Sequence, residues 1–185
     1  MNSKIILGFV GPLSSGKGTA AKYLKEKHQA QVRRFSSILR DVLDRLFLEQ
    51  GRDNMQNLSL ALRQTFGQDL LAKVIAQEVE NLDAEFIVVD GIRRQPDIKY
   101  LRDVPGFHLV HITAEQKIRW QRLVKRGENS DDANKTFKDF QADEQKEAEQ
   151  HIKEVAKEAK FEVDNNGTVE ELYGQIEDIL NRIMN

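Results

Sequence analysis

Short apolar runs alternate with longer amphipathic stretches along the chain. Residues 5–10 form a continuous apolar run that ends in turn residues, which is typical of a central parallel strand covered on both faces. Further apolar strands are predicted over 32–35, 86–90, 107–112 and 161–164. Stretches with helical spacing separate them. This order predicts a three-layer α/β domain with a mainly parallel five-stranded sheet, whose ligands bind beyond the carboxyl ends of the strands.

The helical stretches carry recognisable start and stop signals. Helices are predicted over 17–27, 38–49, 58–79 with an interruption near Gly67, a basic stretch after residue 112, 137–160, and from Thr168 onward. Ser36 or Ser37 is a candidate N-cap of the second helix, and Thr168 begins a capping box. We expect one domain over residues 1–185.

Composition and charge narrow the class of protein. The chain is 39% hydrophobic and 31% charged, which is ordinary for a globular protein. Its formal net charge of −2 provides no general attraction to nucleic acid or to a membrane surface, so any phosphate binding must be local. The absence of cysteine excludes disulfides and thiolate metal sites, and we expect a cytoplasmic protein.

The turn after the first strand has the spacing of a phosphate-binding loop. From Gly11 the chain reads GPLSSGKG, which matches G-x-x-x-x-G-K between a strand and a helix. Gly11 and Gly16 allow backbone N–H groups to surround an anion, Ser14 and Ser15 lie in the same loop, and Lys17 adds a positive charge at the helix N-terminus. We predict that this loop binds the phosphates of ATP. The alternative is a glycine-rich turn with a solvated lysine.

One position departs from the usual loop. Gly18 stands where most such loops have the serine or threonine that binds Mg²⁺, and Thr19 follows one residue later. The resulting GKGT resembles the loop of the adenylate kinase and nucleoside monophosphate kinase family. The resemblance implies a three-layer P-loop NTPase fold in which Gly18 and Thr19 contact phosphate, Thr19 is a candidate Mg²⁺ ligand, and an acid elsewhere orders the waters around Mg²⁺.

Phosphoryl transfer also needs a site that aligns the acceptor. The segment FIVVDGIRR at residues 86–94 resembles the D-G-F-P-R motif of the same family, and its D-G-x-R form is similar to that of deoxynucleotide kinases and dephospho-CoA kinases. The resemblance implies that Asp90 orders a magnesium-bound water and that Arg93 or Arg94 binds the acceptor. Which arginine points inward stays open, and an Asp-Gly turn with solvated arginines is the alternative.

Two more arginines are candidates for the acceptor site. Arg40 ends the segment SSILR, a partial match to the family's T-G-D-x-L-R that lacks its glycine and aspartate. Arg63, in LRQTFG, is a candidate by residue type alone, and its stem can also simply pack while its head is solvated. The resemblance implies a helical acceptor-binding insertion at about residues 36–82.

The basic helix carries Arg119, Arg122 and Arg126 at i, i+3 and i+7, so one helix face can direct all three to one anion. From Arg122 the chain reads RLVKRGENSDD, which resembles the UMP/CMP kinase segment R-L-x-K-R-G-E-x-S-G-R-x-D-D without its Gly-Arg-x. The resemblance implies a short lid at about 119–140, with Arg122 and Arg126 catalytic beside Lys17, and Arg119 and Asn166 in the ATP site. A solvated charged helix is the alternative.

These features predict a phosphotransferase that uses ATP and Mg²⁺ and acts on a nucleoside or deoxynucleoside monophosphate. We expect a monomer or weak dimer whose partner is a small-molecule phosphate acceptor, with no nucleic-acid or membrane partner. A dephospho-CoA kinase-like enzyme is one rival hypothesis. A nucleotide-dependent ATPase or switch is another, because a shortened lid admits water to the donor.

Overall fold

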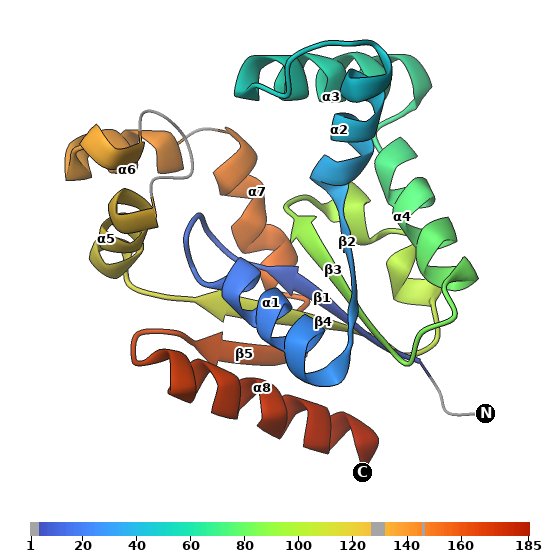
Figure 1. The fold of residues 1–185 in the computed structure, drawn as a ribbon, viewed down its shortest axis with the longest axis vertical. Helices are drawn as coiled ribbons and strands as arrows, with labels where there is room; N and C mark the ends of the chain where they lie inside the picture. The colour runs from blue at the N-terminus through green and yellow to red at the C-terminus, as the bar shows by residue number, and fades with distance from the viewer. Residues whose placement is uncertain (1–3, 127–131, 146) are drawn as a thin grey trace.

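The computed structural model describes residues 4–126, 132–145 and 147–185, which form a parallel sheet with helices on both faces (Figure 1). The strands in these ranges are β1 (Ile5–Val10), β2 (Gln31–Arg34), β3 (Phe86–Ile92), β4 (Phe107–Thr113) and β5 (Phe161–Asp164). They pair in the order β2-β3-β1-β4-β5, and each neighbouring pair is parallel. The predicted three-layer α/β fold with a mainly parallel five-stranded sheet is confirmed.

Each face of the sheet has its own apolar core. Helices α1 (Lys17–His28) and α8 (Val169–Met184) cover one face, where Leu24 and Ile176 join the strand residue Phe9. Helices α4 (Leu70–Asn81) and α7 (Glu147–Ala156) contribute to the cluster on the other face. Because the central strand β1 is covered on both sides, all of its residues are buried, which explains its continuous apolar sequence.

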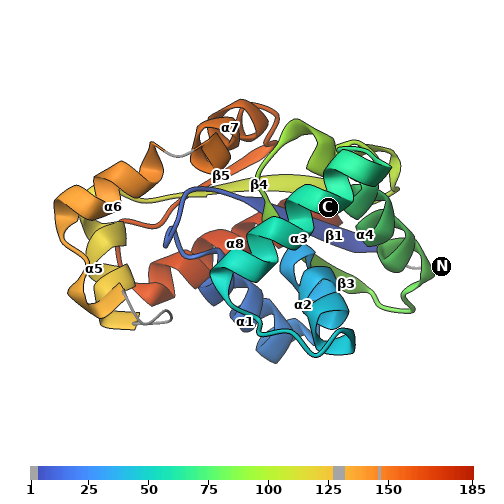
Figure 2. The same cartoon turned by 90° about the horizontal axis from the view of Figure 1, so that it is seen from above.

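The remaining helical segments lie around the carboxyl edge of the sheet, except η2, which comes shortly before the start of β4. They are α2 (Phe35–Arg45), α3 (Arg52–Phe66), α5 (Gln116–Arg126), α6 (Phe137–Glu144) and the short 3-10 segments η1 (Gln95–Ile98), η2 (Leu101–Asp103) and η3 (Asp132–Asn134). Figures 1 and 2 show α2 and α3 on one side of the loop between β1 and α1, and α5 and α6 on the other. Within the described ranges, no helix is both long enough and apolar enough to cross a membrane.

Helix α2 lies earlier in the sequence than the predicted helix over 38–49. It begins at Phe35 with Arg34 at the N-cap, so Ser36 and Ser37 lie inside its first turn and neither of them caps it. The start is set by packing, because the Phe35 side chain is buried in the core that covers β3.

The end of α2 is a Schellman motif. Phe47 adopts φ +58, its N–H donates to Asp44 O, and the N–H of Leu48 donates to Leu43 O at 2.9 Å. These bonds satisfy the last carbonyls of the helix, so it ends at Arg45 rather than at residue 49.

The charged stretch predicted as one helix over 137–160 forms the two helices α6 and α7. Phe140 of α6 is fully buried beside α5, whereas Ile152 and Val155 of α7 belong to the core on the sheet. One straight helix cannot place both sets in these two locations. Residues 127–131 of the predicted lid lie outside the described residues.

A polar network joins α1 to α8. The Glu177 carboxylate accepts a hydrogen bond from the Tyr23 hydroxyl at 2.7 Å, lies 2.7 Å from His28 Nε2, and lies 3.2 Å from Lys27 Nζ. Burial acts to raise the pKa of Glu177, but the hydrogen bonds to His28, Tyr23 and Lys27 outweigh it and lower the pKa from 4.5 to about 2.

We therefore expect Glu177→Gln to lower the free energy of unfolding by about 1–2 kcal/mol at pH 7. The depressed pKa in the folded state means that this stabilisation is present above pH 4.5 and is lost as the pH falls toward 2. Urea denaturation of both proteins at pH 7 and pH 3 measures the difference. An equal difference at the two pH values would contradict the prediction. Glu26→Gln is the control, because the pair that Glu26 forms with Lys22 is exposed and 3.7 Å long.

Candidate functional site

The loop between β1 and α1 has the backbone of an anion-binding turn. Gly11, Ser14 and Gly16 have φ values of +155, +58 and +110. A Cβ on Gly11 would lie 2.0 Å from the carbonyl oxygen of Ile112, and a Cβ on Gly16 would lie 2.1 Å from Nδ2 of Asn165. Both positions therefore require glycine.

The same loop holds two hydroxyl groups that have no hydrogen-bond partner among the described residues. Ser14 Oγ and Ser15 Oγ are both buried, and Ser15 as a whole has no exposed surface. A buried polar group without a partner costs about 1–3 kcal/mol. Oxygens of a bound anion would accept hydrogen bonds from these hydroxyls, so the loop fits the phosphates of a nucleotide.

Lys17 brings a positive charge to this loop. Its Nζ donates to Gly11 O at 2.6 Å and to Pro12 O at 2.8 Å, at the N-terminus of α1. Gly18 and Thr19 follow in the first turn and are exposed. No atom lies within 4 Å of a Cβ placed on Gly18, so steric space does not require glycine at this departure from the usual loop.

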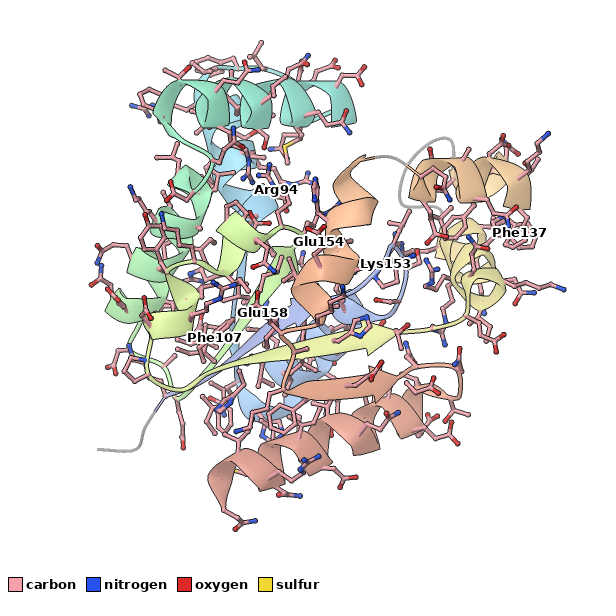
Figure 3. The ribbon with its side chains drawn as sticks, turned by 180° about the vertical axis from the view of Figure 1, so that it is seen from behind. Arg94, Phe107, Phe137, Lys153, Glu154 and Glu158 are labelled. Atoms are coloured by element: carbon pink, nitrogen blue, oxygen red, sulfur yellow. The ribbon has the colours of Figure 1, made fainter. Side chains whose placement is uncertain are left out.

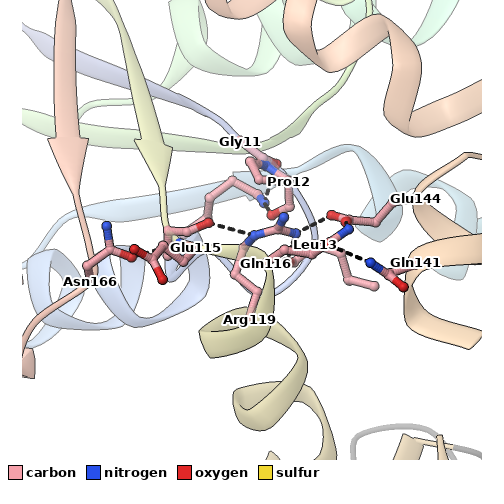
Figure 4. A network of polar contacts seen from close by, with 11 residues as sticks. Gly11, Pro12, Leu13, Glu115, Gln116, Arg119, Gln141, Glu144 and Asn166 are labelled. Atoms are coloured by element: carbon pink, nitrogen blue, oxygen red, sulfur yellow. Dashed lines mark hydrogen bonds and ion pairs between the residues drawn. The ribbon is translucent and has the colours of Figure 1, made fainter. Parts of the chain in front are cut away.

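Arg119 connects the loop to α5 and α6, as Figure 4 shows. Its side chain is almost fully buried, Nε donates to Ala114 O at 2.8 Å, and Nη1 donates to Leu13 O at 3.2 Å. The same Nη1 forms an ion pair with Glu144 of α6. The side chain predicted to bind ATP is thus held directly beside the phosphate-binding loop.

The other two arginines of this helix have different surroundings. Arg122 donates to Asn165 O at 2.8 Å and to Gly167 O at 3.4 Å, and burial lowers its pKa. Arg126, at the end of α5, is exposed. Arg119 and Arg122 therefore donate to different segments of the chain.

Asn165 is a site residue that the sequence analysis missed. It is buried, its Nδ2 donates to Ser15 O at 2.8 Å, and its N–H donates to Thr113 O at 2.8 Å. The predicted neighbour, Asn166, instead accepts from Glu115 N at 2.7 Å. The available signal for Asn165 was a polar residue directly after the last strand, at the carboxyl edge of a parallel sheet.

The end of β3 brings the predicted acid and arginines next to the loop. Asp90 pairs in register with Phe9 of β1, and its carboxylate lies 3.4 Å from Nε of Arg34, which the sequence analysis did not select. The next residue of β1, Val10, pairs with Ile92, because the register shifts by one residue at Gly91. Gly11 and Arg93 therefore directly follow two paired residues on neighbouring strands, so the two segments begin side by side at the carboxyl edge of the sheet.

A buried carboxylate brings three of the predicted acceptor residues together. Asp97 of η1 is 3% exposed, and its Oδ2 accepts from the backbone N–H groups of Arg93 and Arg94 at 3.0 Å each. Its Oδ1 lies 3.5 Å from Arg63 Nη1 and 3.9 Å from Arg94 Nη2. Burial raises the pKa of Asp97, while the backbone N–H groups and the charges of Arg93 and Arg94 act to lower it. Figure 3 shows Arg94 below α3 and beside α7.

Arg40 makes a different contact. It is exposed on α2, and its Nη1 donates to Gln50 Oε1 at 3.0 Å. Asp97 itself was not selected from the sequence, because a single acid after Gln95-Pro96 has the appearance of ordinary turn chemistry.

Comparison with known proteins places the chain in a family. The model of an AAA domain family matches residues 7–151, which include the phosphate-binding loop, Asp97 and Arg119. A UPF0200 protein of Methanosarcina acetivorans is 30% identical over 181 residues, covering 97% of this chain and 95% of the relative. The chain belongs to the UPF0200 family. A second UPF0200 protein, from Methanocaldococcus jannaschii, is 28% identical over 98% of this chain and 91% of its own.

Solved structures of other proteins have the same architecture as this UPF0200 chain. TT1252 from Thermus thermophilus is 19% identical, has a TM-score of 0.64, and matches over 97% of each chain. Shikimate kinase from Bacteroides thetaiotaomicron is 11% identical, has a TM-score of 0.60, and matches over 96% of this chain and 98% of its own. At these identities the likeness concerns the fold. The protein is a P-loop nucleotide-binding domain, and its fold is similar to that of the shikimate kinase structure.

Proposed function

We propose that this UPF0200 protein transfers the γ-phosphoryl group of ATP to the phosphate of a nucleoside or deoxynucleoside monophosphate. The observation that carries the proposal is the register of β1 and β3. Val10 pairs with Ile92, so the phosphate-binding loop and the Arg93-Arg94 pair begin side by side. A site for the phosphates of a donor next to guanidinium groups for an acceptor is what phosphoryl transfer requires.

The residues of the loop would hold the donor. Backbone N–H groups of the loop other than Pro12, which has none, and Ser15, whose N–H donates to Pro12 O, would offer hydrogen bonds to phosphate oxygens. The Lys17 ammonium and the hydroxyls of Ser14 and Ser15 would add to them. Mg²⁺, when bound, withdraws negative charge from these oxygens. Asp90 would order its waters, and Thr19 is a second candidate ligand.

The phosphate group of the acceptor would be bound by arginines at the end of β3 and on the helical insertion. Arg93, Arg94 and Arg63 are grouped by Asp97, and Arg40 would join them from α2. The transfer breaks the bond between the γ-phosphorus and its bridging oxygen and forms a bond to an acceptor phosphate oxygen, so ADP and a nucleoside diphosphate leave. A phosphate monoester is mostly ionised at pH 7, so this acceptor needs no general base, unlike a hydroxyl.

Arginines of α5 would neutralise charge that develops during the transfer. Arg122 now donates to the carbonyls of Asn165 and Gly167, so in this proposal it exchanges those bonds for phosphate oxygens when the donor binds. Arg126 would act in the same way from the end of α5.

A coupled assay of ADP formation tests the proposal. The full chain is supplied with ATP, Mg²⁺ and, one at a time, ribo- and deoxynucleoside monophosphates and dephospho-CoA. We expect one monophosphate to raise the rate by about tenfold or more over the rate without acceptor, since alignment of the acceptor lowers the barrier. Equal rates with and without every acceptor would exclude the kinase and favour an ATPase or switch. Stimulation by dephospho-CoA alone would identify a hydroxyl acceptor instead.

A further inference from the structure

Asp97 is a buried acid for which the proposed reaction has no direct use. Its side chain is 3% exposed, and placing an ionised carboxylate out of water costs several kcal/mol unless donors surround it. The donors here are two backbone N–H groups and the guanidinium groups of Arg63 and Arg94. Each of them belongs to a residue predicted to bind the acceptor. The carboxylate therefore organises that group of residues.

The two kinds of contact differ in length. The bonds from the N–H groups of Arg93 and Arg94 to Oδ2 are 3.0 Å each, so they fix the backbone of the turn directly after β3. The guanidinium contacts to Oδ1 are longer, at 3.5 Å for Arg63 and 3.9 Å for Arg94. Arg63 uses Nε and Nη1 for contacts with Ser59, Gln68 and Asp97, so its Nη2 group and the loosely held Arg94 guanidinium are the donors that can bind a further anion.

Arg63 reaches this group from α3, which packs its half-buried Met55, Leu58 and Leu62 against the core. Among the α3 residues whose exposure is described, 53–66, none is fully buried. Arg63 itself is only 10% exposed, and it also donates to Ser59 Oγ at 3.2 Å and Gln68 O at 2.9 Å. The contact with Asp97 thus joins α3 to the carboxyl edge of the sheet.

We propose that Asp97 is a positioning residue that assembles a phosphate subsite from two separate parts of the chain, with Arg94 on the β3–η1 segment and Arg63 on α3. The role of this subsite as the acceptor site rests on the proposed function. The ligand it takes is the dianionic phosphate group of a monoester, because the two guanidinium groups outnumber the single carboxylate and offer paired donors to phosphate oxygens. Asp97 does not touch the reacting atoms.

Kinetics give the first test. Asp97→Asn keeps the size of the side chain but removes its charge, so we expect the KM for the acceptor to rise about tenfold or more while the KM for ATP changes less than twofold. The matched control is Asp69→Asn, since Asp69 is also a paired carboxylate, with Lys99 Nζ and the Tyr100 hydroxyl each at 2.7 Å, but it lies outside this group. Equal rises of acceptor KM in the two variants would overturn the proposal.

A second test needs no turnover, so it separates this inference from the proposed function. Phenylglyoxal modifies arginines, and peptide mass spectrometry reports its reaction at Arg63 and Arg94 in the presence of increasing inorganic phosphate. We expect phosphate to protect both residues in the wild-type protein and in Asp69→Asn. In Asp97→Asn, the phosphate concentration for half-protection should rise about tenfold or more.

Each outcome is decisive. Protection that depends on Asp97, in a protein that shows no acceptor-stimulated turnover, would support the subsite and reject the kinase. Equal protection in wild type and Asp97→Asn would overturn the subsite, whatever the activity. If Asp97→Asn does not fold, Arg63→Gln replaces it: a tenfold weaker protection of Arg94 supports the joint subsite, and unchanged protection of Arg94 rejects it.

Discussion

Lys17→Ala should lower kcat/KM for ATP by about 10²–10³-fold, the loss typical when one charge-stabilising donor is removed from a transfer site. Lys17 is placed to act on phosphate, because its Nζ lies inside the loop, bonded to the carbonyls of Gly11 and Pro12. Alanine removes the positive charge and these two bonds together. The measurement is steady-state ADP formation with the acceptor found in the panel, accompanied by titration with a fluorescent ATP analogue.

Lys22→Ala is the matched control for this prediction. Lys22 lies on the same helix, its side chain is 73% exposed, and its recorded partner is Glu26 at 3.7 Å. We expect its kcat/KM and nucleotide affinity to stay within about twofold of wild type, since exposed pairs contribute little. If Lys17→Ala matched Lys22→Ala in both measurements, the loop would not be a nucleotide site.

Gly11→Ala should lower the free energy of unfolding by about 3 kcal/mol or more and abolish detectable nucleotide binding. Gly11 has φ +155, and a Cβ there would lie 2.0 Å from the carbonyl oxygen of Ile112 in β4. The obstacle is the backbone of a neighbouring strand, which cannot move without disturbing the sheet. Urea denaturation and the nucleotide titration measure the two effects.

Gly18→Ala provides the contrast within the same loop. Gly18 lies inside α1, and no atom lies within 4 Å of a Cβ placed on it. Alanine is the better helix former, so we expect unchanged stability or a gain of up to about 1 kcal/mol. A loss of stability as large as that of Gly11→Ala would show that loop glycines matter for a reason other than the close approach of β4.

The three-layer α/β fold could be predicted because local runs of apolar residues mark the buried strands. A parallel strand covered on both faces must be apolar at successive positions, so β1 and the apolar part of β3 were visible in the chain as continuous runs. Where packing overrides local signals, the predictions were wrong. Phe35 begins α2 ahead of the serine caps, and Phe140 and Val155 divide one predicted helix because they are buried in different places.

The candidate site likewise contains residues that local sequence could predict and residues that only tertiary contacts reveal. The spacing from Gly11 to Lys17 is dictated by how a backbone surrounds an anion, and that requirement is local. Nothing local distinguishes Asp97 from a turn acid or Asn165 from a turn amide. Their roles come from contacts with Arg63, 34 positions away, and with Ser15, 150 positions away.

The sequence by itself therefore determined the alternation of strands with helical stretches, the mainly parallel sheet, and the spacing of the phosphate-binding loop. Only the tertiary structure decided which arginines share a carboxylate, which asparagine holds the loop, and that Arg119 bonds to Leu13, 106 positions away. The physical reason is that periodicity records the environment of neighbouring residues, whereas a hydrogen bond between distant segments leaves no periodic trace in either of them.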